Sequence, residues 1–121
     1  MSLDQLQRQV DDWITTLGVR YFDPLTNLAQ LVEEVGEVAR VLSRTAGEQS
    51  VRQGQTLPSL DDELADVLFV VTCLANQHGI DLDDAMRRNL QKKTHRDSDR
   101  HLRNPKLRSD AASNSSGSTD Q

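Results

Sequence analysis

Residues 31–40 read Leu31-Val32-Glu33-Glu34-Val35-Gly36-Glu37-Val38-Ala39-Arg40 and place three glutamates beside an apolar helical stripe. Residues 60–69, Leu-Asp-Asp-Glu-Leu-Ala-Asp-Val-Leu-Phe, repeat the arrangement with acids inside another apolar run. A protein can place acids in water almost anywhere. Two acid pairs set against two apolar stripes therefore suggest that a positively charged group belongs between them.

The spacing of the acids puts each pair on one helix face. Glu34 and Glu37 are three residues apart, and so are Glu63 and Asp66. On a helical wheel of about 100° per residue, Glu63 falls inside the apolar sector of its helix and Asp66 at its edge. A carboxylate in such a sector is costly unless it is paired or binds a metal ion.

If the two acid-bearing helices pack antiparallel, the two pairs can face each other. Unit charges about 4 Å apart repel by roughly 4 kcal/mol at an effective dielectric constant near 20. Ligands that are all oxygen suit Mg²⁺, with Mn²⁺ as a substitute, better than zinc or copper. The alternative is that the acids pair with Arg40, Arg44 or a basic segment farther along the chain.

Periodicity and end signals predict an all-α fold, a four-helix bundle with short connections. We expect helices over residues 3–17, 24–44 and 60–77, and a fourth that opens near Asp81 and fades near Asp97. In the second helix the expected buried residues are apolar, with Leu31 and Val38 widening a stripe of Leu28, Val32, Val35, Ala39 and Leu42. Residues 46–58 are expected to form a loop.

The composition predicts one small domain over residues 1–107, followed by a disordered polar tail over residues 108–121. With 36% hydrophobic and 3% aromatic residues, a single chain buries a modest core, which favours association with a second copy. The single cysteine, Cys73, excludes an internal disulfide. No secretory signal and no membrane-spanning run is visible, so we expect a cytoplasmic protein.

Charge is segregated along the chain. Residues 1–86 hold 15 acids and 5 lysines and arginines, whereas residues 87–108 hold 9 lysines and arginines and 2 acids. Within the basic segment, Asn89, Lys92 and Arg96 recur at helical spacing and suit the oxygens of a polyphosphate. The alternative is a basic helix that is simply solvated.

Glu34-x-x-Glu37, a gap of 25 residues and Glu63-x-x-Asp66 together resemble the signature of the MazG-like nucleotide pyrophosphohydrolases, an all-α superfamily. Asn89-x-x-Lys92 with Arg96 is similar to the phosphate-contacting end of its small single-domain members. The lead-in over residues 21–25 fits these members as well. The resemblance covers about residues 1–107.

The resemblance implies hydrolysis of a nucleoside triphosphate to the monophosphate and pyrophosphate, in nucleotide-pool house-cleaning. It makes Glu34, Glu37, Glu63 and Asp66 the catalytic Mg²⁺ ligands, with Glu33 either orienting a water molecule or contacting an extra ion. It also implies a homodimer or homotetramer. The residues that it offers for contact with the base, of which the first three could instead be core residues, are Trp13, Tyr21, Phe22 and Asn27.

Two alternatives remain open. One is a pyrophosphohydrolase of the same superfamily that is specific for dUTP and dCTP or for phosphoribosyl-ATP. The other is a helical module that binds nucleotides without cleaving them. We expect neither a nucleic-acid polymer nor a membrane as partner.

Overall fold

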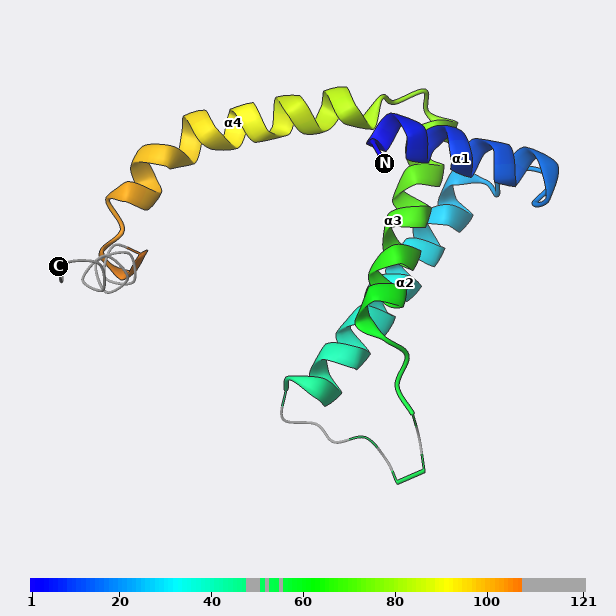
Figure 1. The fold of residues 1–121 in the computed structure, drawn as a ribbon, viewed down its shortest axis with the longest axis horizontal. Helices are drawn as coiled ribbons and strands as arrows, with labels where there is room; N and C mark the ends of the chain where they lie inside the picture. The colour runs from blue at the N-terminus through cyan, green and yellow to red at the C-terminus, as the bar shows by residue number, and fades with distance from the viewer. Residues whose placement is uncertain (48–50, 52, 55, 108–121) are drawn as a thin grey trace, which may run out of the picture. The chain divides into compact units, whose positions relative to one another are not determined.

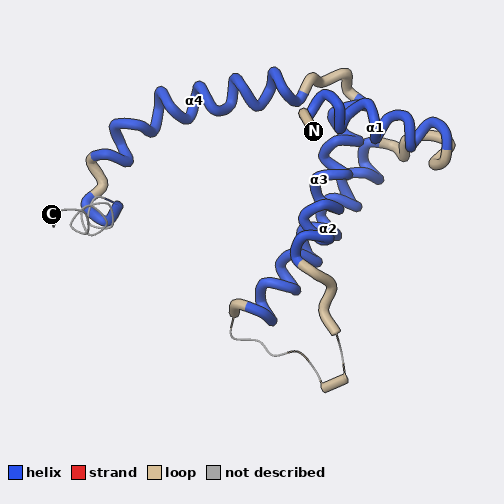
Figure 2. Tube along the Cα trace, viewed as in Figure 1, coloured by secondary structure: helices blue, strands red, loops and turns tan. Residues whose placement is uncertain are grey.

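The computed structural model describes residues 1–47, 51, 53–54 and 56–107. It contains four long helices, and the described residues include no strand (Figures 1 and 2). The helices are α1 (Leu3–Thr16), α2 (Pro24–Thr45), α3 (Leu60–Gln77) and α4 (Leu82–Leu102). The expected all-α fold is confirmed. The predicted tail, residues 108–121, and part of the predicted loop lie outside the described residues.

The chain divides into two compact units, residues 1–83 and residues 84–121. In the first unit α2 and α3 lie side by side and run in opposite directions, and α1 packs against α3 (Figure 1). The antiparallel pairing brings the middle of α2 to the first half of α3. This is the arrangement that the acid pairs require.

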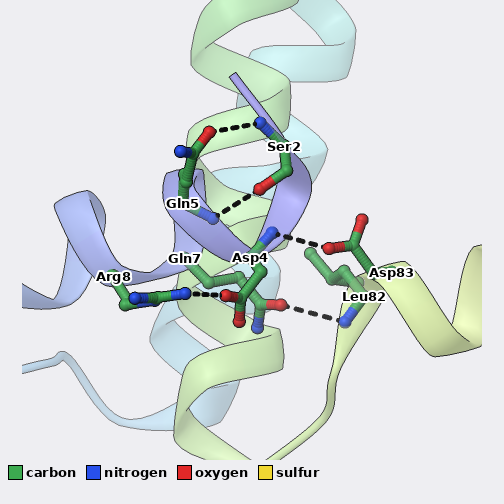
Figure 3. A network of polar contacts seen from close by, with 7 residues as sticks. All are labelled: Ser2, Asp4, Gln5, Gln7, Arg8, Leu82 and Asp83. Atoms are coloured by element: carbon green, nitrogen blue, oxygen red, sulfur yellow. Dashed lines mark hydrogen bonds and ion pairs between the residues drawn. The ribbon is translucent and has the colours of Figure 1, made fainter.

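Local signals explain where the helices begin. Ser2 and Gln5 form a reciprocal capping box at the start of α1, in which each side chain accepts a hydrogen bond from the other residue's backbone N–H (Figure 3). Asp23 precedes Pro24 at the start of α2, and the Ser59 hydroxyl accepts a hydrogen bond from the Asp62 backbone N–H at the start of α3. Pro24 thus opens α2 without a side-chain cap from Asp23, whereas α3 has a side-chain cap from Ser59.

The start of α4 is tied to α1. The Asp83 carboxylate accepts a hydrogen bond from the backbone N–H of Asp4 at 3.1 Å, and Gln7 Oε1 accepts one from the backbone N–H of Leu82 at 2.9 Å (Figure 3). These bonds satisfy amide donors at the first turns of both helices, which have no partner within their own helix. They hold the connection after α3 in place within the first unit.

The core of the first unit is small. Val10, Ile14 and Cys73 form its centre, with Leu6 and Tyr21 packed against them. Cys73 is buried and free, and burial raises the pKa of its thiol. It serves here as a small apolar residue.

The expected buried face of α2 is wrong by about one residue of helical rotation. Residues 27, 31, 34, 38 and 41 form the face toward α3, since they are buried or half-buried. The central predicted stripe, which includes Val32, Val35 and Leu42, lies about 100° away, and these residues are 64%, 50% and 42% exposed. The two residues that were expected to widen it, Leu31 and Val38, are half-buried as predicted. Hydrophobic periodicity located an apolar stripe on α2, but α2 packs against α3 through the adjacent face of the same helix.

The fourth helix continues to Leu102, beyond the predicted end near Asp97. Residues 98–102 contain neither glycine nor proline, so nothing in them interrupts helical hydrogen bonding. Asn104 precedes Pro105, which disfavours a helical conformation at residue 104. Among the described residues, no helix is long and apolar enough to cross a membrane.

Candidate active site

Three of the four predicted acids meet between α2 and α3. Glu34, Glu63 and Asp66 each offer a carboxylate oxygen, and these oxygens lie within 4.8 Å of one another. We call these three residues the acid cluster. The antiparallel helix pair produces it, because Glu34 lies on the face of α2 toward α3 and the other two acids are one turn apart on α3.

The surroundings of the acid cluster fit a bound cation. Glu63 is only 7% exposed, and within the described ranges no lysine or arginine forms an ion pair with any of its three members. A buried carboxylate without a compensating charge is costly. Three oxygens at this separation form a donor set that suits a hard divalent ion such as Mg²⁺.

Electrostatic repulsion is visible at Glu34. Partial burial raises the pKa of its carboxyl group above the ordinary value, and the nearby charges of Asp66, Glu63, Glu37 and Glu33 raise it further, in that order. The electrostatic potential at Glu34 is therefore negative. A cation bound at this point would reduce the repulsion between the carboxylates.

Glu37, the fourth predicted ligand, lies outside the acid cluster. Its Oε2 accepts a hydrogen bond from Arg40 Nε at 3.1 Å, one turn farther along α2. Both side chains are partly exposed, at 46% for Glu37 and 38% for Arg40, so this ion pair contributes little stability. The alternative expected from the sequence, pairing with Arg40, thus holds for Glu37 and not for the other three acids. Glu33 is exposed.

The three predicted phosphate-binding residues, Asn89, Lys92 and Arg96, are exposed on α4 in the second unit. The Arg96 guanidinium donates two hydrogen bonds to the Asp97 carboxylate, at 2.8 Å and 2.7 Å. Their spacing puts the three residues on one side of α4. Their part in the site stays a prediction.

A mainly apolar cavity of about 240 Å³ lies between α1, α2, α3 and the α1–α2 connection. Gln30, one turn before Glu34 on α2, lines it, and so does Phe69, one turn beyond Asp66 on α3. The Trp13 and Phe69 rings meet edge to face, with centroids 5.8 Å apart and planes at 86°. A single ligand molecule can place a polar group at the acid cluster and an aromatic ring in the cavity.

All four residues suggested for base contact line this cavity; they are Trp13, Tyr21, Phe22 and Asn27. The Tyr21 hydroxyl is already engaged, since it donates to Asp11 at 2.6 Å and accepts from Asn76 Nδ2 at 3.0 Å. Burial, followed by the bond to Asp11, raises the pKa of Tyr21 to about 12. Tyr21 thus offers the cavity its ring, while its hydroxyl anchors the connection.

A sequence model of the MazG nucleotide pyrophosphohydrolase domain matches residues 22–101. The chain belongs to this family. The matched range includes all four predicted acids, and it therefore covers both acid motifs. It also includes the basic residues of α4 and the cavity-lining residues from Phe22 onward.

Individual relatives agree with this assignment. This MazG domain is 38% identical over 102 residues to YpjD of Bacillus subtilis (strain 168), covering 84% of this chain and 92% of YpjD. It is 27% identical over 103 residues to YvdC of the same organism, covering 79% and 96%. The sequences thus match along most of their lengths.

Solved structures show the same fold. The crystal structure of YpjD from Bacillus subtilis superposes with a TM-score of 0.71 at 37% identity, covering 80% of this chain and 97% of that one. The crystal structure of the Bacillus-conserved MazG protein, a nucleotide pyrophosphohydrolase, has a TM-score of 0.68 at 37% identity, covering 82% and 96%. The expected MazG-like fold is confirmed.

Sequence reasoning missed two glutamines at or next to the cavity. Gln30 lines the cavity, and Gln77 hydrogen-bonds to Asn27, which is a lining residue. Glutamine is common on helices, and neither residue stands in a recognisable motif. The signal that could have found Gln30 is its position one turn before Glu34, on the face of α2 toward α3.

Proposed function

We propose that this protein is a Mg²⁺-dependent nucleoside triphosphate pyrophosphohydrolase. It converts a (d)NTP to the (d)NMP and pyrophosphate, removing unwanted nucleotides in the cytoplasm. The observation that carries the proposal is the acid cluster, formed by residues of the two acid motifs within the range that the family model matches. A buried glutamate among like charges is destabilising unless it is protonated or a cation lies nearby.

Each polar group then has a role. Glu34, Glu63 and Asp66 hold the ion, and Glu37 joins them by turning from Arg40. When bound, Mg²⁺ would neutralise phosphate charge and lower the pKa of a water molecule, with Mn²⁺ as a substitute. Asn89, Lys92 and Arg96 bind the phosphate oxygens, Arg96 as a planar fork and Lys92 as a point charge. These last three roles rest on the family resemblance.

The mainly apolar cavity, which we call the aromatic cavity, binds the base of the nucleotide. Its position one turn from the acid cluster supports this, because a nucleotide carries its base and phosphates at opposite ends of one sugar. The rings of Trp13, Phe22 and Phe69 line it and can stack on a heterocycle. Pyrophosphohydrolases specific for dUTP and dCTP or for phosphoribosyl-ATP remain the nearest rivals, and a nucleotide panel that follows pyrophosphate release separates them.

Glu63→Gln tests the proposal. The amide has the shape of the carboxylate but cannot compensate a cation, so we expect pyrophosphate release to fall by about 100-fold or more. Circular dichroism should show unchanged helix content. If release continues at the wild-type rate, the acid cluster is structural and is not the catalytic metal site. If wild-type protein itself releases no pyrophosphate, the non-catalytic module becomes the better interpretation.

The protein also forms a homodimer or homotetramer in this proposal. The supporting feature is an apolar face that the single chain leaves exposed. On α2 it comprises Leu28, Val32, Val35 and Leu42, and α3 adds exposed Leu64 and Leu68. Apolar residues repeated along one helix face are typical of a protein interface rather than of a solvated surface.

A further inference from the structure

Asn27 is a buried polar residue in the wall of the aromatic cavity. It is 3% exposed and lies in the second turn of α2. Its Nδ2 donates a hydrogen bond to Gln77 Oε1 at 2.8 Å. The Nε2 of Gln77 in turn donates to the backbone carbonyl of Phe22. The two amides therefore form a chain that starts at a main-chain oxygen.

The starting point fixes the orientation of both amides. A backbone carbonyl can only accept a hydrogen bond, so the NH₂ group of Gln77 must face Phe22. Oε1 of Gln77 then faces Asn27 and can only accept, so Asn27 must present its NH₂ group to Gln77. Side-chain amides are otherwise ambiguous because nitrogen and oxygen have similar shapes. Here the hydrogen-bond network resolves the ambiguity.

The remaining polar atom of Asn27 is its carbonyl oxygen, Oδ1. In the described part of the chain it accepts no hydrogen bond from another side chain, yet every buried side-chain oxygen and nitrogen has a partner. Oδ1 must therefore keep some open surface. Asn27 lines the cavity, so we assign the open surface of Oδ1 to the cavity, where it would offer a ligand an oriented acceptor.

We infer that Asn27 determines base specificity and that Gln77 is its positioning residue; this rests on the proposed function. The favoured ligand is a base that carries an amino group, cytosine or adenine. Cytosine presents an N–H₂ donor where uracil presents an oxygen. An oxygen opposite Asn27 Oδ1 would leave two acceptors facing each other, and a site built for a hydrogen bond rejects such an analogue.

The experiment compares cytosine and uracil nucleotides, which differ at this edge and have nearly the same size. Trp13 is the single tryptophan of the chain and lines the cavity, so its fluorescence reports binding without turnover. We expect wild-type protein to bind dCMP about tenfold more tightly than dUMP, the effect of one net hydrogen bond. The ratio of kcat/KM for dCTP over dUTP should move in parallel.

Gln77 variants separate positioning from a structural role. In Gln77→Leu the Asn27 amide loses the acceptor that orients it and can turn its NH₂ group to the cavity. The preference should then fall to about one. In Gln77→Glu the carboxylate still accepts from Asn27 Nδ2, so the preference for dCMP should persist. Both ratios compare two ligands in one protein sample, which makes them insensitive to a loss of folded material.

Asn27→Leu removes the acceptor itself and should also abolish the preference. A wild-type ratio of one or below overturns the inference, as does a tenfold ratio that survives in Gln77→Leu and Asn27→Leu. If dCMP is preferred but no triphosphate is hydrolysed, the proposed function fails and the assignment of Asn27 stands. If triphosphates are hydrolysed with no base preference, the proposed function stands and the assignment of Asn27 fails.

Discussion

At the scale of single residues, the acids differ in what surrounds them. Glu63 is buried, Asp66 is exposed and Glu34 lies between these extremes, although their oxygens meet within 4.8 Å. Burial weakens solvent screening, so repulsion inside the acid cluster is stronger than between acids on an open surface. The metal-free protein therefore keeps these charges together at a cost in stability.

Glu34 gives this cost a measurable pH dependence. Its pKa is raised above the ordinary value of a glutamate, so the folded state binds this proton more tightly than the unfolded state. The resulting stability is present below the pKa of the unfolded state and is lost as pH rises through the raised pKa of the folded state. Metal-free Glu34→Gln should lose less stability over this interval than wild type, as measured by urea unfolding in chelator. Parallel curves for the two proteins would contradict the assignment.

At the scale of elements, α2 has two useful faces. One packs on α3 and carries Glu34, and the other, about 100° away, carries Val32 and Val35, which are 64% and 50% exposed. One amphipathic helix can thus build both a site and an interface. Periodicity alone could not assign the two faces, because both repeat with the same spacing.

Val32→Glu should disrupt assembly, because a charge placed in an apolar interface must be desolvated without a partner. We expect a lower molar mass by light scattering after gel filtration, with helix content retained. Thr26→Glu is the matched control: it adds the same charge to α2, about 180° from Val35. If Val32→Glu and wild type have equal masses, this face is not the interface.

On α4, Lys92→Ala should weaken nucleotide binding equally for all bases, since a lysine contacts phosphate as a point charge. We expect KM to rise several-fold without a change in base preference or in melting temperature. Arg87→Ala removes the same charge from a different side of α4 and serves as control. Equal effects of both substitutions would mean that Lys92 acts only through net charge.

At the scale of the whole molecule, metal binding should be coupled to folding. An ion at about 100 times its Kd stabilises the folded state by roughly 2.7 kcal/mol. Melting curves with and without Mg²⁺, recorded in the presence of a nucleoside monophosphate, should show this as a higher melting temperature. Glu63→Gln should show almost no shift. A shift that is unchanged in this variant would place the ion elsewhere.

The sequence by itself determined the bounds of the helices and the two acid motifs that they carry. Apolar periodicity, Pro24 and Ser59 located α2 and α3 to within a residue or two, because caps and periodicity are local properties. The acid motifs likewise predicted the family, and the spacing of Glu63 within an apolar sector predicted its burial. These features depend on neighbours along the chain.

Only the tertiary structure decided how each helix is rotated about its axis. That rotation covers one face of α2 and exposes its apolar neighbour, and it groups Glu34 with Glu63 and Asp66 while Glu37 pairs with Arg40. It also joins Asn27 to Gln77, which lie 50 residues apart. A helical wheel gives relative angles within one helix, whereas packing between helices sets which angle faces the site.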